Sequence, residues 1–166
     1  MNELPSLWRT ELWHPLMVHL PIVTLLLATA AGLLQFVVKS TAHALFLKQI
    51  TFVMLVLGVL GGWLAIYTGQ LAYNIEVRKI CDPQPLQSHQ WWSYVSVIIF
   101  TLTLCIQLTQ KYLNQGLVNY LRVITAILLL MGGCALLYTG HLGASVVYQQ
   151  GAGTYKPSAD CHEFEK

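Results

Sequence analysis

Four long apolar stretches dominate this sequence, and they restrict its possible folds more than any other feature. None of them contains Asp or Glu, and they cover residues 15–38, 49–73, 89–110 and 118–141. A helix needs roughly 20 apolar residues to cross about 30 Å of hydrocarbon. Each stretch is long enough, so each is expected to form a transmembrane helix.

The overall composition also indicates a lipid environment. Hydrophobic residues make up 55% of the 166 residues and charged residues only 10%, against roughly 25% charged residues in soluble domains. The formal net charge is +2 and no run of Lys or Arg occurs, so lipid, and not nucleic acid, is the expected partner. The spans contain neither carboxylates nor a glycine-rich phosphate loop, so a hydrolase is not expected.

Short connections between the spans predict the topology. Residues 39–48 and 111–117 are too few for long crossovers, so neighbouring helices should be antiparallel. The expected fold is all-α, a single domain over residues 1–166 that forms an up-down-up-down four-helix membrane bundle. The end with these turns has four basic residues and no acidic one: Lys39, Lys48, Lys111 and Arg122. The opposite end has five basic residues, so a count of Lys and Arg alone does not decide the orientation. Basic residues beside short, acid-free turns should weigh most, which predicts that the end with the turns is cytoplasmic and both termini lie outside.

An internal repeat links the second and fourth spans. Residues 61–71 and 132–142 both begin with Gly-Gly and continue with Tyr-Thr-Gly, at an offset of 71. The match indicates one helical hairpin used twice, related by a pseudo-two-fold axis along the membrane normal. Small residues of this kind allow close helix packing in lipid, and they would equally admit a flat cofactor. The sequence leaves both uses open.

Four histidines fall near one end of the expected bundle: His14, His19, His89 and His141. A polar ring inside a membrane is costly and usually functional. Haem iron can take one imidazole from each of two helices. His19 and His89 differ in number by about the offset of the repeat, so they are the expected pair of axial ligands. His14 and His141 would bind a second haem, or hydrogen-bond propionates or a quinone headgroup.

Two cysteines are candidates for a disulfide. Cys81 lies between the second and third spans and Cys161 in the C-terminal tail, both on the side expected to be outside. A disulfide persists in such an oxidising compartment. Two free loop thiols are the alternative.

Two motifs resemble a known family. Residues 14–22, HPLMVHLPI, resemble the HPxxVHxPI opening of the bacterial membrane proteins called domain of unknown function 2231. Residues 139–153 are similar to that family's closing TGxxGG…LVY…GVG stretch, and His89 matches its central histidine. The resemblance implies a four-helix domain of a bacterial inner membrane, associated with haem proteins and respiratory modules. Ala144, where glycine is common, and the tail with Cys161 depart from the pattern.

These observations favour a b-type haem membrane protein that transfers electrons near the outer face of the membrane. One haem b, or two close together, would exchange electrons with a quinol or a periplasmic carrier. An electron carrier or redox subunit is expected rather than a stand-alone enzyme, with other respiratory subunits or a second copy as partners. Two alternatives stay open. The same histidines could bind copper, iron or zinc without a porphyrin, or the chain could be a structural subunit without a cofactor.

Overall fold

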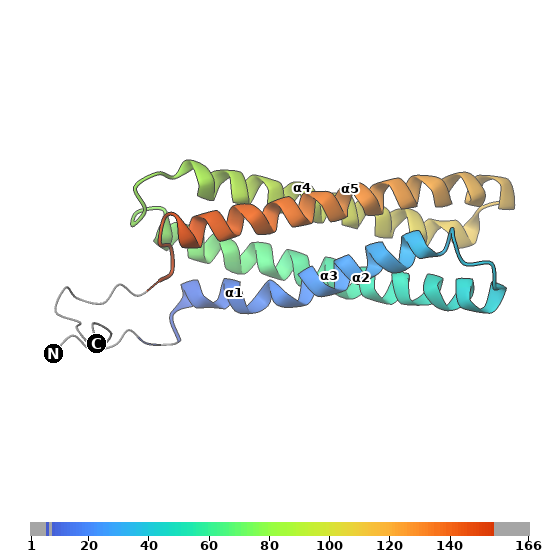
Figure 1. Ribbon diagram of the computed structural model, residues 1–166, viewed down its shortest axis with the longest axis horizontal. Coiled ribbons are helices and arrows are strands. Elements are labelled where there is room, and N and C mark those ends of the chain that lie inside the picture. The colour runs from blue at the N-terminus through green and yellow to red at the C-terminus, as the bar shows by residue number, and fades with distance from the viewer. Residues whose placement is uncertain (1–5, 7, 155–166) are drawn as a thin grey trace, which may run out of the picture.

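A computed structural model describes residue 6 and residues 8–154. The described chain is helical, without strands, and its long helices run antiparallel in one bundle (Figure 1). The elements are η1 (Thr10–Leu12), α1 (Trp13–Met17), α2 (His19–Leu34), α3 (Thr41–Glu76), α4 (Gln84–Thr109), η2 (Gln110–Tyr112) and α5 (Gln115–Tyr148). Four runs of helix within these residues are long and apolar enough to cross a membrane. The predicted all-α four-helix membrane bundle is confirmed.

A proline explains the break between α1 and α2. Pro21 has no N–H to donate to the carbonyl of Met17, the residue four positions earlier, and its ring crowds that carbonyl. The regular hydrogen bonding is interrupted at Val18, although α1 and α2 continue in nearly one direction (Figure 1). Together with η1 they make up the first span, from Thr10 to Leu34.

The helices are longer than the apolar stretches suggested. α3 begins at Thr41 instead of residue 49 because residues 41–48 contain no Gly or Pro and are rich in Ala and Leu, which favour helix. α5 continues to Tyr148 instead of residue 141. With 36 and 34 residues, these helices are each about 50 Å long at about 1.5 Å per residue, well beyond about 30 Å of hydrocarbon.

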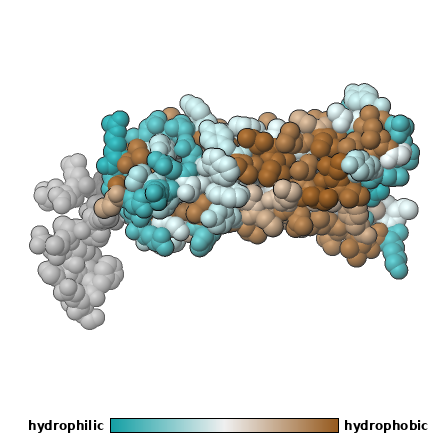
Figure 2. Space-filling model, turned by 90° about the horizontal axis from the view of Figure 1, so that it is seen from above, coloured by the Kyte–Doolittle hydropathy of each residue, from teal (hydrophilic) through white to brown (hydrophobic). Residues whose placement is uncertain are grey.

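The surface shows where the extra length lies. On the face seen in Figure 2, an apolar band crosses the bundle, with hydrophilic surface at both ends. The wider hydrophilic region is at the end where α1 begins and α5 stops. We call this end the histidine end and the opposite end, which carries the α2–α3 and α4–α5 turns, the cationic end. The bundle therefore extends past the apolar band mainly at the histidine end.

Helices pack most closely within two hairpins, α2 with α3 and α4 with α5. Glycines allow these approaches: a Cβ at Gly58 would collide with Leu25, and one at Gly132 would lie 3.0 Å from Phe100. The apolar centre of the bundle consists of Leu25, Ala28, Leu55, Val59, Phe100 and Leu129.

Equivalent contacts show that the second hairpin repeats the first. The numbers of matched residues differ by 75 in the first helix of each hairpin and by 74 in the second. The matched pairs are Gln35–Thr51 with Gln110–Thr125, and Leu25–Gly58 with Phe100–Gly132. The offset of 71 read from the glycine motifs is about one helical turn short of this register. The hairpin repeat therefore exists in space, but the motif copies lie at different depths in their hairpins.

Candidate cofactor site

His14 and His89 lie side by side at the histidine end. Their ring centroids are 6.0 Å apart and the ring planes are inclined by 77°. His14 comes from α1 and His89 from α4, so each hairpin contributes one ring. Both side chains are half-buried. Their numbers differ by 75, the offset of the structural repeat, so the two rings are equivalent in the two hairpins.

Each ring is fixed by a backbone carbonyl of its own hairpin. The Nδ1 atom of His14 lies 2.9 Å from the carbonyl oxygen of Ala65, and that of His89 lies 3.0 Å from the carbonyl oxygen of Thr139. A carbonyl can only accept a hydrogen bond, so each Nδ1 carries the proton and donates. The Nε2 atom of each neutral ring then keeps its lone pair. This arrangement is typical of metal-binding histidines.

Glycines give both rings access to these carbonyls. In an α-helix the carbonyl of one residue points at the residue four positions later. That later residue is Gly69 for Ala65 and Gly143 for Thr139. A Cβ at Gly69 would lie 3.0 Å from Cε1 of His14, and one at Gly143 would lie 3.1 Å from Cε1 of His89. Any larger residue at either position would push its histidine away from the carbonyl.

His19 and His141 lie elsewhere on the bundle. His19 is exposed at the start of α2, and the ring beside His89 is that of His14. The structure thus differs from the expected pairing of His19 with His89. Five residues separate His14 from His19, which turns the second side chain about 140° around the helix axis. His141 is exposed and stacks on Tyr138, with centroids 6.5 Å apart. A cofactor-binding role for any of the four histidines stays a prediction.

At this end of the bundle, a polar contact joins the two hairpins and an aromatic contact lies within the second hairpin. Gln90 of α4 donates a hydrogen bond of 2.7 Å to Gln70 of α3. Trp92 of α4 packs edge-on against Tyr138 of α5, with centroids 5.0 Å apart. Ser96 lies two helical turns from His89 on the same face of α4. Its hydroxyl is buried, with no hydrogen-bond partner among the described residues.

A buried carboxylate closes this end of the bundle. Glu76, at the end of α3, accepts hydrogen bonds from Nζ of Lys79 at 2.9 Å and from the backbone N–H of Gly153 at 2.8 Å. Gly153 has a φ of 71°, a backbone conformation that favours glycine. Glu11 is also buried and pairs with Arg9 at 3.4 Å. The burial of these two acids was not predicted from the sequence, because it depends on contacts between distant segments.

Within the described chain, no three His, Cys, Asp or Glu side chains gather where they could hold one metal ion. The His14–His89 pair would therefore offer two protein ligands at most. Cys81 is exposed after α3. Its proposed partner Cys161 lies outside the described residues, so the disulfide stays a prediction.

The fold defines the class of protein: a multi-pass membrane protein, built from a repeated helical hairpin, with one histidine of each hairpin meeting at one end. Comparison with protein families gives a match over residues 12–156 to the family described as "Predicted membrane protein (DUF2231)". The chain belongs to this family, as the two motifs indicated. Neither the curated proteins nor the solved structures include a significant match.

Proposed function

We propose that this protein binds one haem b between its two hairpins, with His14 and His89 as the axial ligands. The separation of the two rings carries the proposal. Two metal–nitrogen bonds of about 2.1 Å, extended to the ring centres, separate two imidazole centroids on one ion by about 6 Å. The observed separation is 6.0 Å, between rings that both keep Nε2 available for a metal.

The number of protein ligands favours haem over a bare metal ion. Structural zinc takes four protein ligands, catalytic zinc three and non-haem iron three. A porphyrin supplies four nitrogens itself and needs only two more from the protein. A pair of imidazoles from two helices suits that need.

Ser96 adds independent support. A buried hydroxyl without a partner is rare in native proteins and usually has water or a bound group beside it. Ser96 is in this position on the same face of α4 as His89. A group bound between the hairpins could supply the missing hydrogen bond.

A bound haem would supply one-electron transfer, and the surrounding residues have clear roles in supporting it. The carbonyls of Ala65 and Thr139 orient the rings and raise the basicity of Nε2, as partners of metal-binding histidines do. Glu76 is buried at this end and holds Lys79 and the backbone of Gly153. By limiting the access of water to the site, these contacts would tune the reduction potential of a haem iron.

Absorption spectra of the purified protein, oxidised and reduced, test the proposal. We expect a Soret band, a pyridine haemochrome of b type, and about one haem per chain. His14→Ala and His89→Ala should each remove most of the haem, because each removes one axial ligand. The matched controls His19→Ala and His141→Ala should retain it. A haem-free protein after expression with added haem precursor would overturn the proposal, and a bound metal without porphyrin would favour the bare-ion alternative.

We further propose that the protein lies in a bacterial inner membrane with the histidine end outside, where a quinol or a periplasmic carrier exchanges electrons with it. The support is the set of basic residues at the opposite end. Membrane-impermeant thiol labelling of intact cells tests this orientation. With Cys81 and Cys161 both replaced by Ser, Gln84→Cys should react and Ser40→Cys should not; the reverse pattern would invert the topology.

A further inference from the structure

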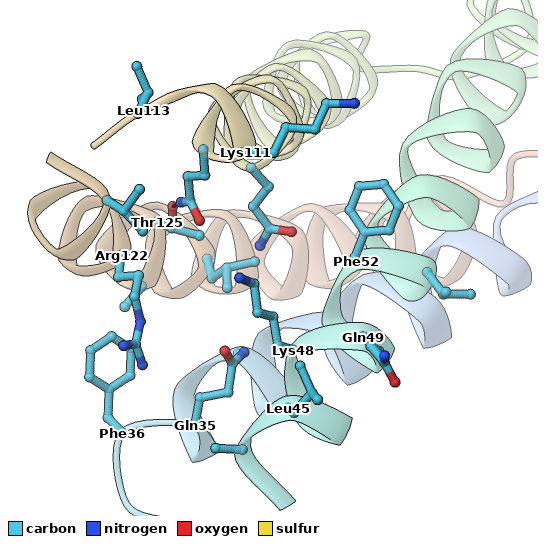
Figure 3. Close-up of a pocket in the computed structure, with 18 of the residues that line it drawn as sticks. Gln35, Phe36, Leu45, Lys48, Gln49, Phe52, Lys111, Leu113, Arg122 and Thr125 are labelled. Atoms are coloured by element: carbon cyan, nitrogen blue, oxygen red, sulfur yellow. Dashed lines mark hydrogen bonds between the residues drawn. The ribbon is translucent and has the colours of Figure 1, made fainter. Parts of the chain in front are cut away.

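The cationic end contains a cavity of about 1040 Å³ between the two hairpins. Three basic side chains from three segments line it: Lys48 of α3, Lys111 of η2 and Arg122 of α5. Lys48 extends from α3 toward the middle of the cavity, and Arg122 turns toward Phe36 (Figure 3). The guanidinium carbon of Arg122 lies 5.7 Å from the centre of that ring. The cavity is partly open to the surface of the bundle.

Among the residues that the structure describes, no carboxylate lines this cavity to balance these charges. The sequence contains no Asp or Glu from residue 12 to residue 75, nor from residue 83 to residue 159. Every residue that lines the cavity falls within these two ranges. Three cations around one cavity repel one another, and an anion between them would relieve that repulsion. By contrast, Lys79 at the histidine end has two carboxylates within 4 Å.

Neutral hydrogen-bonding groups in the same cavity suit an oxygen-rich anion. Gln35 and Gln110 are equivalent in the repeat, and both line the cavity. Each uses one amide N–H on a threonine, Thr51 at 3.1 Å and Thr125 at 3.5 Å. The second N–H of each amide can donate to a ligand. Two amides and the cations of Lys48 and Arg122 thus come from both hairpins to line one space. Lys111 also lines it, but its Nζ extends away from Lys48 (Figure 3) and lies 4.8 Å from the centre of the Tyr112 ring.

The hairpin repeat supports the cavity as a specific binding site, because equivalent residues of the two hairpins line it. Lys48 and Arg122 differ by 74 in number, the offset of the second helix in each hairpin, so they are equivalent residues. Lys and Arg residues that only set the orientation of the protein need only lie near the membrane boundary. These two instead occupy matched positions in one cavity, whereas Lys39, at the same end, does not line it.

We propose that this cavity binds the phosphate group of a ligand with net negative charge, held by Lys48, Lys111 and Arg122. Arginine can grip phosphate oxygens with two parallel hydrogen bonds, and lysine acts as a point charge. Apolar side chains that include Leu45, Phe52 and Val53 line the same cavity, and they could contact acyl chains. Basic pockets between transmembrane helices bind anionic lipid headgroups in this way. The phosphate can come from an anionic phospholipid or from a soluble phosphate compound.

Native mass spectrometry of the full chain in detergent tests the site, with phosphatidylglycerol, phosphatidylcholine and inorganic phosphate as separate probes. Lys48→Gln should weaken phosphatidylglycerol binding about five-fold, and Lys48→Gln with Arg122→Gln about 30-fold. The matched control Lys39→Gln removes one charge at the same end outside the cavity and should change binding less than about two-fold. The charge-preserving swap Lys48→Arg with Arg122→Lys should retain binding.

The probes distinguish the two sources of phosphate. Binding of phosphatidylglycerol but not inorganic phosphate would identify a lipid site. Binding of inorganic phosphate that competes with the lipid, with the same dependence on Lys48, would identify a soluble ligand. Either result supports the proposal. It is overturned if phosphatidylcholine binds as well as phosphatidylglycerol and inorganic phosphate does not bind, or if Lys39→Gln weakens binding as much as Lys48→Gln.

Discussion

The two ends of the bundle are made from the same pair of hairpins, yet they differ in closure and in charge. At the histidine end, Glu76 pairs with Lys79 and holds the backbone of Gly153. At the cationic end, Lys48 and Arg122 line a cavity that has no carboxylate among its described lining residues. Paired charges at one end stabilise the fold. Unpaired charges at the other leave binding capacity for an anion.

The connections explain why one end is closed. After α5, residues 149–154 fold back, with the N–H of Ala152 donating to the carbonyl of Val146 at 3.2 Å. Ala152 packs on Leu86 and Val146 in a small apolar cluster. The cationic end has only two short turns, over residues 35–40 and 113–114. No segment there is long enough to cover the space between the hairpins.

The largest effect should come from the glycines that face the histidine rings. Gly69→Val and Gly143→Val each force a side chain against a ring held by a carbonyl, and overpacking of this kind costs about 1–3 kcal/mol. Thermal unfolding in detergent measures the change. The control is Gly140→Val, which lies in the same helix as Gly143 but has no atom within 4 Å of its Cβ. Equal destabilisation by all three variants would show that helix distortion, and not ring contact, is responsible.

A smaller effect should follow from weakening the closure. In Glu76→Gln the amide can still accept from Gly153, but the charge that strengthens both hydrogen bonds is lost, at a cost of about 1 kcal/mol. Hydrogen exchange of residues 149–154 should become faster. The exposed Asp82→Asn is the control, since its carboxylate only accepts from Gln84 at the start of α4. Unchanged exchange in Glu76→Gln would mean that the apolar cluster alone holds the segment.

The smallest effects should appear at the matched glutamines near the cationic end. Gln35→Leu and Gln110→Leu each remove one hydrogen bond to a threonine, worth about 0.5–1 kcal/mol. The shorter bond of Gln35, 3.1 Å against 3.5 Å, predicts the larger loss for Gln35→Leu. Melting temperatures relative to the exposed Gln49→Leu measure both. A loss at one glutamine without any at the other would break their structural equivalence.

The sequence predicted the number of helices and their antiparallel order because lipid demands long apolar stretches. It also placed the four histidines at one end. It could not predict which rings would meet, because five residues of helix turn His19 away from the direction of His14. The shared Gly-Gly and Tyr-Thr-Gly motifs gave the wrong offset for the repeat, since identical residues lie at different depths in the two hairpins.

The burial of charged side chains could not be predicted from the sequence either. Glu11 and Glu76 are buried in the folded chain, where Arg9, Lys79 and Gly153 contact their carboxylates. Lys48 and Arg122 were visible as orientation signals. Their arrangement around one cavity depends on how the hairpins pack, and hydropathy does not report that packing.

The repeated hairpin makes the chain resemble a dimer whose two subunits share one polypeptide. A ligand on the axis of a true dimer meets identical groups on both sides and has two equally favourable orientations. Here Lys48 on one side corresponds to Arg122 on the other, and Ala65 corresponds to Thr139. Joining the halves has allowed them to diverge, so each end of the axis can select a single direction for whatever it binds.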